Sequence, residues 1–530
     1  RAFYLDEEKD LDRDRSFESY VDNFRSVDEQ SYTPPKQLSS VLRPYQEEGF
    51  RWLSARCDAG FGGILADEMG LGKSLQLISL LLARRDKARG VGPSLIVCPA
   101  SLVYNWLQEF ARFAPELTVR AVAGPKADRR RIRALSLPAP DGSAASDPCD
   151  VLVTSYDLLR IDIHDWVGER FFLCALDEAQ YVKNPAALVT RAVKRIEAEH
   201  RFALTGTPME NRLSELWSIF DFLMPGLLGP YARFRERFEL PIVGGDEDTA
   251  RRLQALVGPF MLRRLKTQVL SDLPEKLESV VYAPMIGEQL KLYSAHEQRL
   301  REELTHQKND KAAKNGGRKS GMSDAEFNKS KVQILAELTR LRQLCCDPRL
   351  LYENYKGPAA KLDAICDLVD SAMGGGEKAL VFSQFTSFLS LIADRLDAAG
   401  VRYFTITGAT PKEERLELVN RFNADDTPVF LISLKAGGTG LNLTGASVVI
   451  HADPWWNAAA QDQATDRAHR IGQTHVVSVE RVIAKGTIEE RILALQEAKS
   501  DLADQVVGAS GVSLASLSRD DLVDLLSPIE

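Results

Sequence analysis

Short apolar runs alternate with helical patterns along the first part of the chain, from Leu42 to about Pro208. Five runs end at a polar, glycine or proline residue: GGILA (62–66), SLIVCPA (94–100), DVLVTS (150–155), FFLCALDE (171–178) and RFALTGTP (201–208). Runs without polar alternation are typical of parallel strands that are buried on both faces of a sheet. This part therefore predicts an α/β lobe built on a parallel sheet.

A second series with the same rhythm begins near Lys361. Its strand candidates are KALVFSQF (378–385), RYFTITG (402–408), PVFLISL (428–434), ASVVIHADP (446–454) and VVSVERVIA (476–484). The region between the two series, about 210–360, is mostly helical in pattern. It contains a polar, glycine-bearing stretch at 306–324, which we expect to form a mobile excursion.

These patterns divide the chain into five parts. We expect a charged lead-in (1–40), a first lobe (41–209), helical insertions with the connection between lobes (210–360), a second lobe (361–505) and a C-terminal helix (506–530). Ser518 is a suitable N-cap for that last, acidic helix. Because the chain opens on Arg1 rather than Met, we also expect upstream sequence, with room for a targeting domain.

Composition excludes several classes of protein. The chain has 530 residues, of which 44% are hydrophobic, and no window approaches eighteen uninterrupted apolar residues, so no membrane span is expected. The seven cysteines form no CxxC pair, which argues against a zinc site or disulfide framework and favours a reducing cytoplasm. The net charge of −8 does not exclude a nucleic-acid partner, because local basic strips determine that affinity.

A glycine-rich turn, ADEMGLGKS (66–74), follows the first strand candidate and precedes an apolar helix. Backbone N–H groups of such a turn can surround phosphates, with Lys73 reaching the outer phosphates and Ser74 binding Mg²⁺. The strict GxxxxGK[ST] pattern fails because position 67 is Asp. Gly70 and Gly72 nonetheless flank the turn, and the strand–turn–helix context favours a nucleotide site.

Two acids, Asp177 and Glu178, end the strand candidate FFLCALDE. The first can hold Mg²⁺ and the second can polarise an attacking water. Together with the glycine-rich turn they predict a nucleotide-hydrolysing lobe. A third strand end, LTGTPMENRLSELW (204–217), is either an ordinary turn or an element that couples the phosphate site to a bound track.

The second series carries two candidate contacts to nucleic acid. SLKAGGTGLNLTGA (433–446) is either a flexible turn or a loop that contacts a sugar-phosphate chain, helped by Lys435 and Thr439. Trp455 and Trp456 belong either to the core or to an aromatic platform beside a strand. Sequence alone leaves both pairs of alternatives open.

The stretch DQATDRAHRIGQ (462–473) places Gln463, Arg467 and Arg470 on one face if it is helical. Two arginines on a helix are usually solvated or paired with acids. The phosphates that they could serve lie with the glycine-rich turn, far upstream in the other lobe. The spacing alone leaves open why a pair of cations should lie so far from those phosphates.

The motifs, in their order, resemble the Swi/Snf-type ATPases, DNA translocases with the superfamily-two helicase fold. The resemblance spans about Leu42 to Arg491 and is carried by LRPYQEEGFRWL, LADEMGLGKSLQ, CPASLVYNWLQEF, VTSYDLL, DEAQYVKN, LTGTPMENRLSELWSIFDFLMPGLLG, FMLRRLKTQVLSDLPEK, LRQLCCDP, VFSQFT, SLKAGGTGLNLTGASVVIHADPWWN and DRAHRIGQ. The short linkers are similar to those of a prokaryotic member.

The resemblance implies two RecA-like parallel-sheet lobes with helical protrusions, and ATP with Mg²⁺ in the cleft between them. It assigns ATP binding to Gln46, Gly70, Gly72, Lys73, Ser74, Gln180 and Gly440, and Mg²⁺ to Ser74 and Asp177. It assigns catalysis to Lys73, Asp177, Glu178, Arg467 and Arg470, the two arginines acting as fingers from the second lobe. Expected DNA contacts are Ser101, Thr154, Ser155, Gln384, Lys435, Thr439, Trp455 and Asn457.

The implied activity is ATP hydrolysis stimulated by double-stranded DNA, with translocation that leaves the strands paired and displaces or remodels DNA-bound protein complexes. The resemblance further implies a cytoplasmic, nucleoid-associated monomer. Two alternatives stay open: a helicase that separates strands, and a non-enzymatic DNA-binding or polymerase-binding scaffold. The scaffold is disfavoured because Lys73, both strand-end acids and both arginines are present.

Overall fold

The structure is a computed structural model that describes residues 29–137, 145–206, 213–270, 274–314, 324–437, 441–456 and 458–496. Of these, the side chains at 303–314, 324–333, 412, 413, 435, 437 and 459 are not described. The chain forms two compact units, made mainly of residues 1–272 and 273–502. Across the described ranges, the helices are all too short or too polar to cross a membrane.

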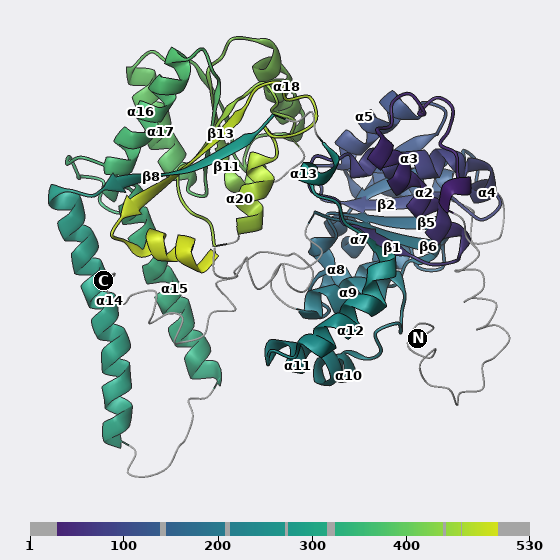
Figure 1. The fold of residues 1–530 in the computed structure, drawn as a ribbon, viewed down its shortest axis with the longest axis horizontal. Helices are drawn as coiled ribbons and strands as arrows, with labels where there is room; N and C mark the ends of the chain where they lie inside the picture. The colour runs from purple at the N-terminus through teal and green to yellow at the C-terminus, as the bar shows by residue number, and fades with distance from the viewer. Residues whose placement is uncertain are drawn as a thin grey trace. The chain divides into compact units, whose positions relative to one another are not determined.

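The first unit contains a seven-stranded parallel sheet in the order β3-β4-β2-β5-β6-β1-β7 (Figure 1). The strands are β1 (Gly63–Leu65), β2 (Ser94–Cys98), β3 (Val119–Val122), β4 (Val151–Ser155), β5 (Arg170–Asp177), β6 (Glu197–Leu204) and β7 (Met261–Leu262). The central strands β2 and β4 are buried at every residue, as their uninterrupted apolar runs predict.

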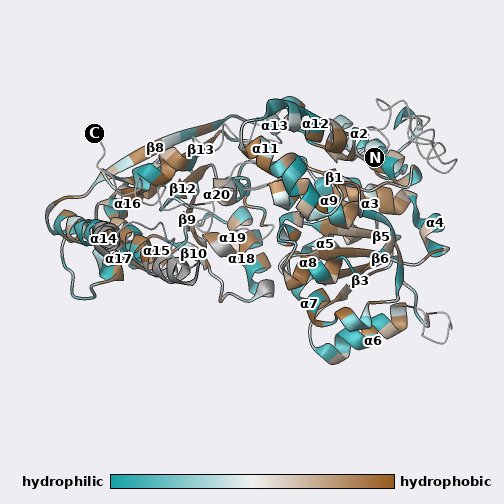
Figure 2. Cartoon of the chain, turned by 90° about the horizontal axis from the view of Figure 1, so that it is seen from below, coloured by the Kyte–Doolittle hydropathy of each residue, from teal (hydrophilic) through white to brown (hydrophobic). Residues whose placement is uncertain are grey.

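Helices cover both faces of this sheet. They are α2 (Pro44–Asp58), α3 (Lys73–Ala83), α4 (Arg85–Arg89), α5 (Val103–Phe113), α6 (Lys126–Ser136), α7 (Tyr156–Ile161), α8 (Leu188–Val193), α9 (Leu213–Leu223), α10 (Tyr231–Phe234), α11 (Leu240–Val243), α12 (Glu247–Val257) and α13 (Lys266–Val269). Successive residues of β2 enter different cores: Leu95 packs with α7 to α9, and Ile96 packs with α2, α3 and α5. The apolar strands between two layers of helices are visible as brown ribbons in Figure 2.

The second unit contains a six-stranded parallel sheet in the order β10-β11-β9-β12-β13-β8. Its strands are β8 (Lys276–Pro284), β9 (Ala379–Ser383), β10 (Tyr403–Ile406), β11 (Val429–Ser433), β12 (Val448–His451) and β13 (Val477–Lys485). The expected fold, two lobes each built on a parallel sheet, is therefore confirmed.

The helices of the second unit fall into two groups. Those that cover the sheet are α16 (Ala360–Gly374), α17 (Thr386–Ala398), α18 (Lys412–Ala424), α19 (Leu434–Gly437) and α20 (Ala458–Thr465). The other two, α14 (Gly287–Lys314) and α15 (Asp324–Cys346), form a long pair anchored by a small apolar core that includes Tyr293, Leu344 and Ile488 (Figure 1). The expected excursion at 306–324 begins within α14, and its part from 315 to 323 lies outside the described residues.

The region 210–360 contains two strands among its helices. It supplies β7 to the first sheet and β8 to the second. Both strands lie at an edge, and most residues of β8 are exposed, so β8 lacks the apolar run that marks a buried strand. The expected C-terminal helix (506–530) and residues 1–28 of the lead-in lie outside the described residues.

Candidate functional site

The glycine-rich turn lies between β1 and α3 of the first unit. Gly70 and Gly72 have φ angles of 85° and 74°, a left-handed conformation that glycine adopts without strain. A Cβ atom on Gly72 would lie 2.5 Å from the Nε2 atom of Gln46, so a side chain there would also clash. Helix α3 begins at Lys73, and its N-terminal N–H groups therefore adjoin the turn, the arrangement that binds phosphate.

The Lys73 side chain folds back over its own turn. Its Nζ atom donates to the carbonyl oxygens of Asp67 at 2.7 Å and Glu68 at 3.4 Å. These neutral acceptors hold the ammonium group over the turn without cancelling its charge. A phosphate oxygen can replace a carbonyl as acceptor and would bind more strongly, because the bond would then join two charged groups.

Asp67, the residue that breaks the strict phosphate-loop pattern, forms an ion pair with Arg264. The Nε atom of Arg264 lies 2.9 Å from Oδ1, its Nη2 atom bonds to Oδ2, and Gln76 of α3 donates to Oδ2 at 3.1 Å. Arg264 also donates to Gln76 Oε1 at 2.9 Å and to the carbonyl oxygen of Tyr45. The Asp67 side chain is fully buried, so it stabilises the turn from beneath. Sequence reasoning missed Arg264.

Gln46, the expected adenine-binding residue, fastens α2 to the turn. Its Oε1 atom accepts from the backbone N–H of Arg43 at 3.0 Å, and its Nε2 atom donates to the carbonyl oxygen of Leu71 at 3.1 Å. The residue is 3% exposed. Any contact of Gln46 with a base must therefore use the second hydrogen of its amide group or the second lone pair of its oxygen.

Asp177 ends β5, and its carboxylate is held by N–H donors. The indole Nε1 of Trp106 donates to Oδ2 at 2.9 Å, and the backbone N–H of Glu178 donates to Oδ1 at 3.0 Å. Burial, followed by the charge of Glu178, raises the pKa of Asp177 to about 7, while the Trp106 bond and the Lys73 ammonium act in the opposite direction. Glu178 has a φ of 52°, the only positive value among described residues other than glycine, which marks strain at this strand end.

The donor set here suits Mg²⁺, which is usually bound by one or two protein groups, with phosphate oxygens and water completing its shell. Ser74 supplies a hydroxyl in the first turn of α3, and Asp177 supplies a carboxylate whose raised pKa a cation would lower. Among the described residues, no group of three or more His, Cys, Asp and Glu side chains could hold a metal on its own.

A short chain of hydrogen bonds joins the end of β6 to Glu178. Thr205, the threonine directly after that strand, donates from Oγ1 to Gln180 Oε1 at 2.9 Å, and Gln180 Nε2 donates to Glu178 Oε2 at 2.8 Å. Gln180 thus orients the acid that is expected to polarise water. The motif LTGTPMENRLSELW therefore begins in contact with the site, although its residues 207–212 lie outside the described ranges.

The three expected DNA contacts of the first unit differ in exposure. Ser101 lies in the turn after β2 and is half-buried. Thr154 and Ser155 are 1% and 2% exposed. The Thr154 hydroxyl donates to the carbonyl oxygen of Val122 at 2.9 Å, and the Ser155 hydroxyl caps α7 by accepting from the Leu158 N–H at 3.3 Å. Both hydroxyls therefore have structural partners, and Ser101 is the more accessible residue.

In the second unit, Gln384 follows β9, and Trp455 follows β12. Trp455 is half-buried against the core of the α18–α20 side of the sheet, and Trp456 is buried in the core beside α14 and α15. For Trp456 the core alternative is therefore correct. Lys435 belongs to α19, whereas Thr439, Gly440 and Asn457 lie outside the described residues.

The two arginines do not share a helix, contrary to the sequence prediction. Helix α20 ends at Thr465, and residues 466–470 form turns and a bend. The carbonyl oxygen of Arg467 accepts from the Leu443 N–H at 2.9 Å, and Arg470 Nη1 donates to the Leu441 carbonyl oxygen at 3.4 Å. Hydrogen bonds to Leu441 and Leu443, in the loop before β12, thus take the place of regular helical hydrogen bonds at these two arginines. Gly472, with a φ of 104°, completes the departure from helix.

His469, between the two arginines, contacts the segment that leads into β8. Its Nε2 atom lies 2.8 Å from the carbonyl oxygen of Pro274 and is hydrogen-bonded to it. The N–H of Val477 donates to the Glu275 carbonyl oxygen at 3.1 Å and extends the same attachment. The start of the second unit and the arginine segment are therefore fixed to each other. Sequence reasoning missed this role of His469.

Comparison with known proteins identifies two adjoining domain families. The SNF2-related domain matches residues 45–350, and the helicase conserved C-terminal domain matches residues 360–472. The first match alone covers more than half of the chain. The boundary between the two matches falls just before α16, the first helix of the second unit to cover its sheet.

The relatives are ATP-dependent helicases and transcription-factor-associated proteins. The chain is 38% identical over 92% of its length to YwqA of Bacillus subtilis, a candidate ATP-dependent helicase/translocase, and 36% identical over 98% of its length to the TATA-binding protein-associated factor mot1 of Aspergillus fumigatus. It spans 51% of the first and 29% of the second.

Among solved structures, the Sulfolobus solfataricus SWI2/SNF2 ATPase core in complex with double-stranded DNA is 32% identical to this chain, with 92% of this chain and 97% of that chain covered and a TM-score of 0.43. The match of the SNF2-related domain and the identity to YwqA decide the classification. The chain belongs to the SNF2-related, or Swi/Snf-type, ATPase family.

Proposed function

We propose that this chain is an ATP-driven motor that hydrolyses ATP in response to double-stranded DNA and moves along the duplex without separating its strands. The observation that carries this proposal is the placement of the phosphate turn after β1 and of the two acids at the end of β5, both at the carboxyl ends of strands in one parallel sheet. The charge of Lys73 opposes the rise in the pKa of Asp177, which supports a single site made of the turn and these acids.

In this proposal each residue of the constellation has one task. Lys73 and the first turn of α3 bind the outer phosphates, Ser74 and Asp177 hold Mg²⁺, and Glu178, oriented by Gln180, positions the attacking water. Bound Mg²⁺ neutralises charge on the phosphate oxygens. The hydrogen bond of 2.8 Å from Gln180 fixes the Glu178 carboxylate, which would then keep the water in line.

Arg467 and Arg470 complete the site by stabilising the charge that develops on the transferred phosphoryl group. An arginine in that position contributes roughly 10³–10⁵ to the rate. Because both residues belong to the second unit, hydrolysis requires the two units to close on the nucleotide. Alternate closing and opening then moves two DNA-binding surfaces along the duplex, one step for each ATP.

The partners follow from the relatives. One solved relative is a complex with double-stranded DNA, and the mot1 proteins are named for association with the TATA-binding protein. We therefore infer that duplex DNA is the track and that a protein bound to DNA is the object which the motor, acting as a monomer, displaces. Similarity to an ATP-dependent helicase of Mycoplasma pneumoniae keeps strand separation as the second candidate activity.

The test measures ATP hydrolysis with and without blunt duplex DNA, for the native chain and for Lys73→Ala and Arg470→Ala. We expect duplex DNA to stimulate the native chain, Lys73→Ala to abolish hydrolysis, and Arg470→Ala to reduce turnover by about 10³-fold with ATP affinity retained. Absence of stimulation by DNA would refute the proposal. Release of a labelled strand from a forked duplex would instead support the helicase.

A further inference from the structure

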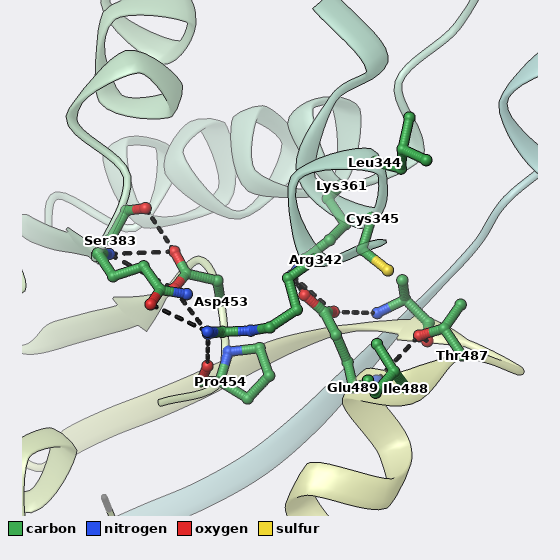
Figure 3. Close-up of polar contacts among 12 residues, drawn as sticks. Arg342, Leu344, Cys345, Lys361, Ser383, Asp453, Pro454, Thr487, Ile488 and Glu489 are labelled. Atoms are coloured by element: carbon green, nitrogen blue, oxygen red, sulfur yellow. Dashed lines mark hydrogen bonds and ion pairs between the residues drawn. The ribbon is translucent and has the colours of Figure 1, made fainter. Parts of the chain in front are cut away.

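Arg342, near the end of α15, is a buried arginine that joins two loops of the second unit (Figure 3). It is 2% exposed. Its Nη1 atom donates to Gln384 Oε1 at 3.0 Å, and its Nη2 atom donates to the carbonyl oxygen of Pro454. The first loop follows β9 and the second follows β12, neighbouring strands at the centre of the sheet. One guanidinium group therefore spans the carboxyl ends of both strands.

The surroundings of Arg342 hold its guanidinium group in one place. The Nη2 atom lies 3.7 Å from the Asp453 carboxylate, and the group lies over the rings of Phe385 and Trp456, at 5.7 and 5.6 Å from their centres. These distances are typical of cation–π contacts. The planar fork of arginine is needed to reach an amide, a carbonyl and a carboxylate together, and a lysine could not do so.

Asp453 joins the same two loops independently. Its carboxylate accepts from the Ser383 hydroxyl and from the Gln384 backbone N–H, at 3.2 Å for the nearer oxygen. Asp453 therefore fixes the backbone of the loop after β9, whereas Arg342 fixes the side chain that this loop presents. The two effects can be separated by substitution.

Arg342 also determines which way the Gln384 amide points. A guanidinium group has only donors, so the amide must turn its oxygen toward Arg342. The amide nitrogen then points away, and it is a buried atom without a hydrogen-bond partner among the described residues. An unsatisfied buried donor is rare in folded proteins and calls for an explanation. A phosphate oxygen of DNA, which only accepts, can be its partner if the loops move enough to uncover this nitrogen, which is closed to solvent here.

We propose that Arg342 is a positioning residue for DNA binding, which holds the loops after β9 and β12 together and turns the Gln384 amide N–H₂ toward the DNA backbone. The inference rests on the proposed function, since the track is taken to be DNA. It assigns a role to the helical pair as well. Because Arg342 belongs to α15, movement of this pair is transmitted directly to the two loops.

A purely structural buried charge nearby makes the contrast clear. Lys361 of α16 and Glu489 form an ion pair at 2.8 Å, and both side chains are fully buried (Figure 3). Glu489 accepts in addition from the Ala484 N–H at 2.9 Å. These partners belong to the core beneath α14 and α15, and none of them is an expected DNA contact. Arg342, by comparison, donates to Gln384, which is an expected DNA contact.

The experiment compares Arg342→Lys with Arg340→Lys. Arg340 lies on the same helix but is exposed, and it pairs with Glu337 on the surface. For each variant, ATP hydrolysis is measured against the concentration of a blunt duplex. We expect Arg342→Lys to raise the half-saturating DNA concentration about tenfold, with a change of less than twofold in the KM for ATP. Arg340→Lys should match the native chain.

A second variant, Gln384→Glu, keeps an acceptor for Arg342 and removes the N–H₂ donors. It should also raise the half-saturating DNA concentration, and it keeps the inference testable if Arg342→Lys fails to fold. Equal DNA dependence of Arg342→Lys and Arg340→Lys, or of Gln384→Glu and the native chain, would overturn the inference. Failure of DNA to stimulate the native chain would instead overturn the proposed function, so the two failures are distinguishable.

Discussion

Arg264 in the first unit and Arg342 in the second are both buried beneath expected functional loops, but the two arginines have different partners. Arg264 in the first unit binds a carboxylate through two nitrogens and lies under the phosphate turn. Arg342 in the second unit donates to an amide and a carbonyl, with its nearest carboxylate oxygen at 3.7 Å. A two-point ion pair fixes a single geometry, whereas neutral acceptors exchange partners at lower cost.

The difference fits the tasks that we propose for the two regions. A phosphate turn must keep one shape through every cycle of hydrolysis, and Arg264 connects Asp67, Gln76 and Tyr45 into one block around it. A surface that steps along DNA must instead release and rebind phosphates. For that surface, an arginine that orients a neutral amide is more suitable than one locked to an acid. The comparison predicts which substitutions unfold a unit and which change only its ligand dependence.

The largest expected effect is on stability, from Asp67→Ala. Removing this carboxylate takes away the acid that Arg264 contacts through two nitrogens and leaves only Glu48, at 3.8 Å, which costs about 3–5 kcal/mol in the free energy of unfolding. Asp453→Ala should cost less, about 1–3 kcal/mol, because Arg342 lies 3.7 Å from the Asp453 carboxylate and makes no hydrogen bond of ordinary length to it. The loss of stability of each variant is measured by denaturant unfolding, with hydrogen exchange monitored separately in each unit. Equal losses in the two units would contradict the comparison.

A third acid, the half-buried Asp177, has an indole N–H in place of an arginine, and its raised pKa gives a prediction about pH. From about pH 4 to pH 7 the folded protein holds a proton that the unfolded chain has lost, so this acid lowers stability as pH rises through that window. Asp177→Asn should therefore raise the melting temperature of the nucleotide-free protein above pH 7. The corresponding gain in the free energy of unfolding should be at most about 4 kcal/mol. The gain should vanish toward pH 4.

Glu178→Gln is the matched control for that experiment. It removes the second cause of the raised pKa of Asp177 and leaves the first cause, burial, in place. Its gain in melting temperature above pH 7 should therefore be smaller than that of Asp177→Asn. Adding Mg²⁺ and nucleotide should remove much of the advantage of Asp177→Asn, because the cation stabilises the ionised carboxylate of the native chain. A pH-independent gain would show that the charge of Asp177 is not the cause.

The sequence predicted the parts of the molecule that depend on local patterns. Central strands are continuous apolar runs, and the glycines at positions 70 and 72 indicate the phosphate turn. Of the four edge strands, β10 was predicted and β3, β7 and β8 were missed: β3 has three half-buried residues out of four, and β8 is mostly exposed. Neither carries the pattern of a buried strand, because an edge strand has neighbours on one side only.

The buried arginines could not be predicted for a different reason. Arg264 lies 197 residues from Asp67, and Arg342 lies 112 residues from Pro454. No local pattern distinguishes either from the many exposed arginines of the chain. The helix expected through Arg467 and Arg470 failed in the same way, since contacts with the loop before β12 outweigh the local helical spacing. Long-range partners, rather than propensities, determine these three sites.

A reciprocal pair of conservative variants sharpens the comparison with a smaller effect. Arg264→Lys keeps the charge beside Asp67 but loses the contacts with Gln76 and Tyr45, so the phosphate turn loosens. The KM for ATP should rise about tenfold, with little change in the half-saturating DNA concentration. Arg342→Lys should give the opposite pattern. If both variants changed the same parameter, the division of labour between the two arginines would be wrong.

The smallest expected effect comes from Gln46→Ala. Gln46 joins the first turn of α2 to Leu71 of the phosphate turn through two hydrogen bonds, at 3.0 and 3.1 Å. Losing them should raise the KM for ATP about fivefold and lower stability by about 1 kcal/mol. Gln37→Ala, which removes an exposed bond to Glu116, is the control and should change neither value. If Gln46 also recognises adenine, its variant should lose preference for ATP over GTP. If the preference for ATP over GTP is unchanged and the KM for ATP is raised, Gln46 only stabilises the turn, as Arg264 does.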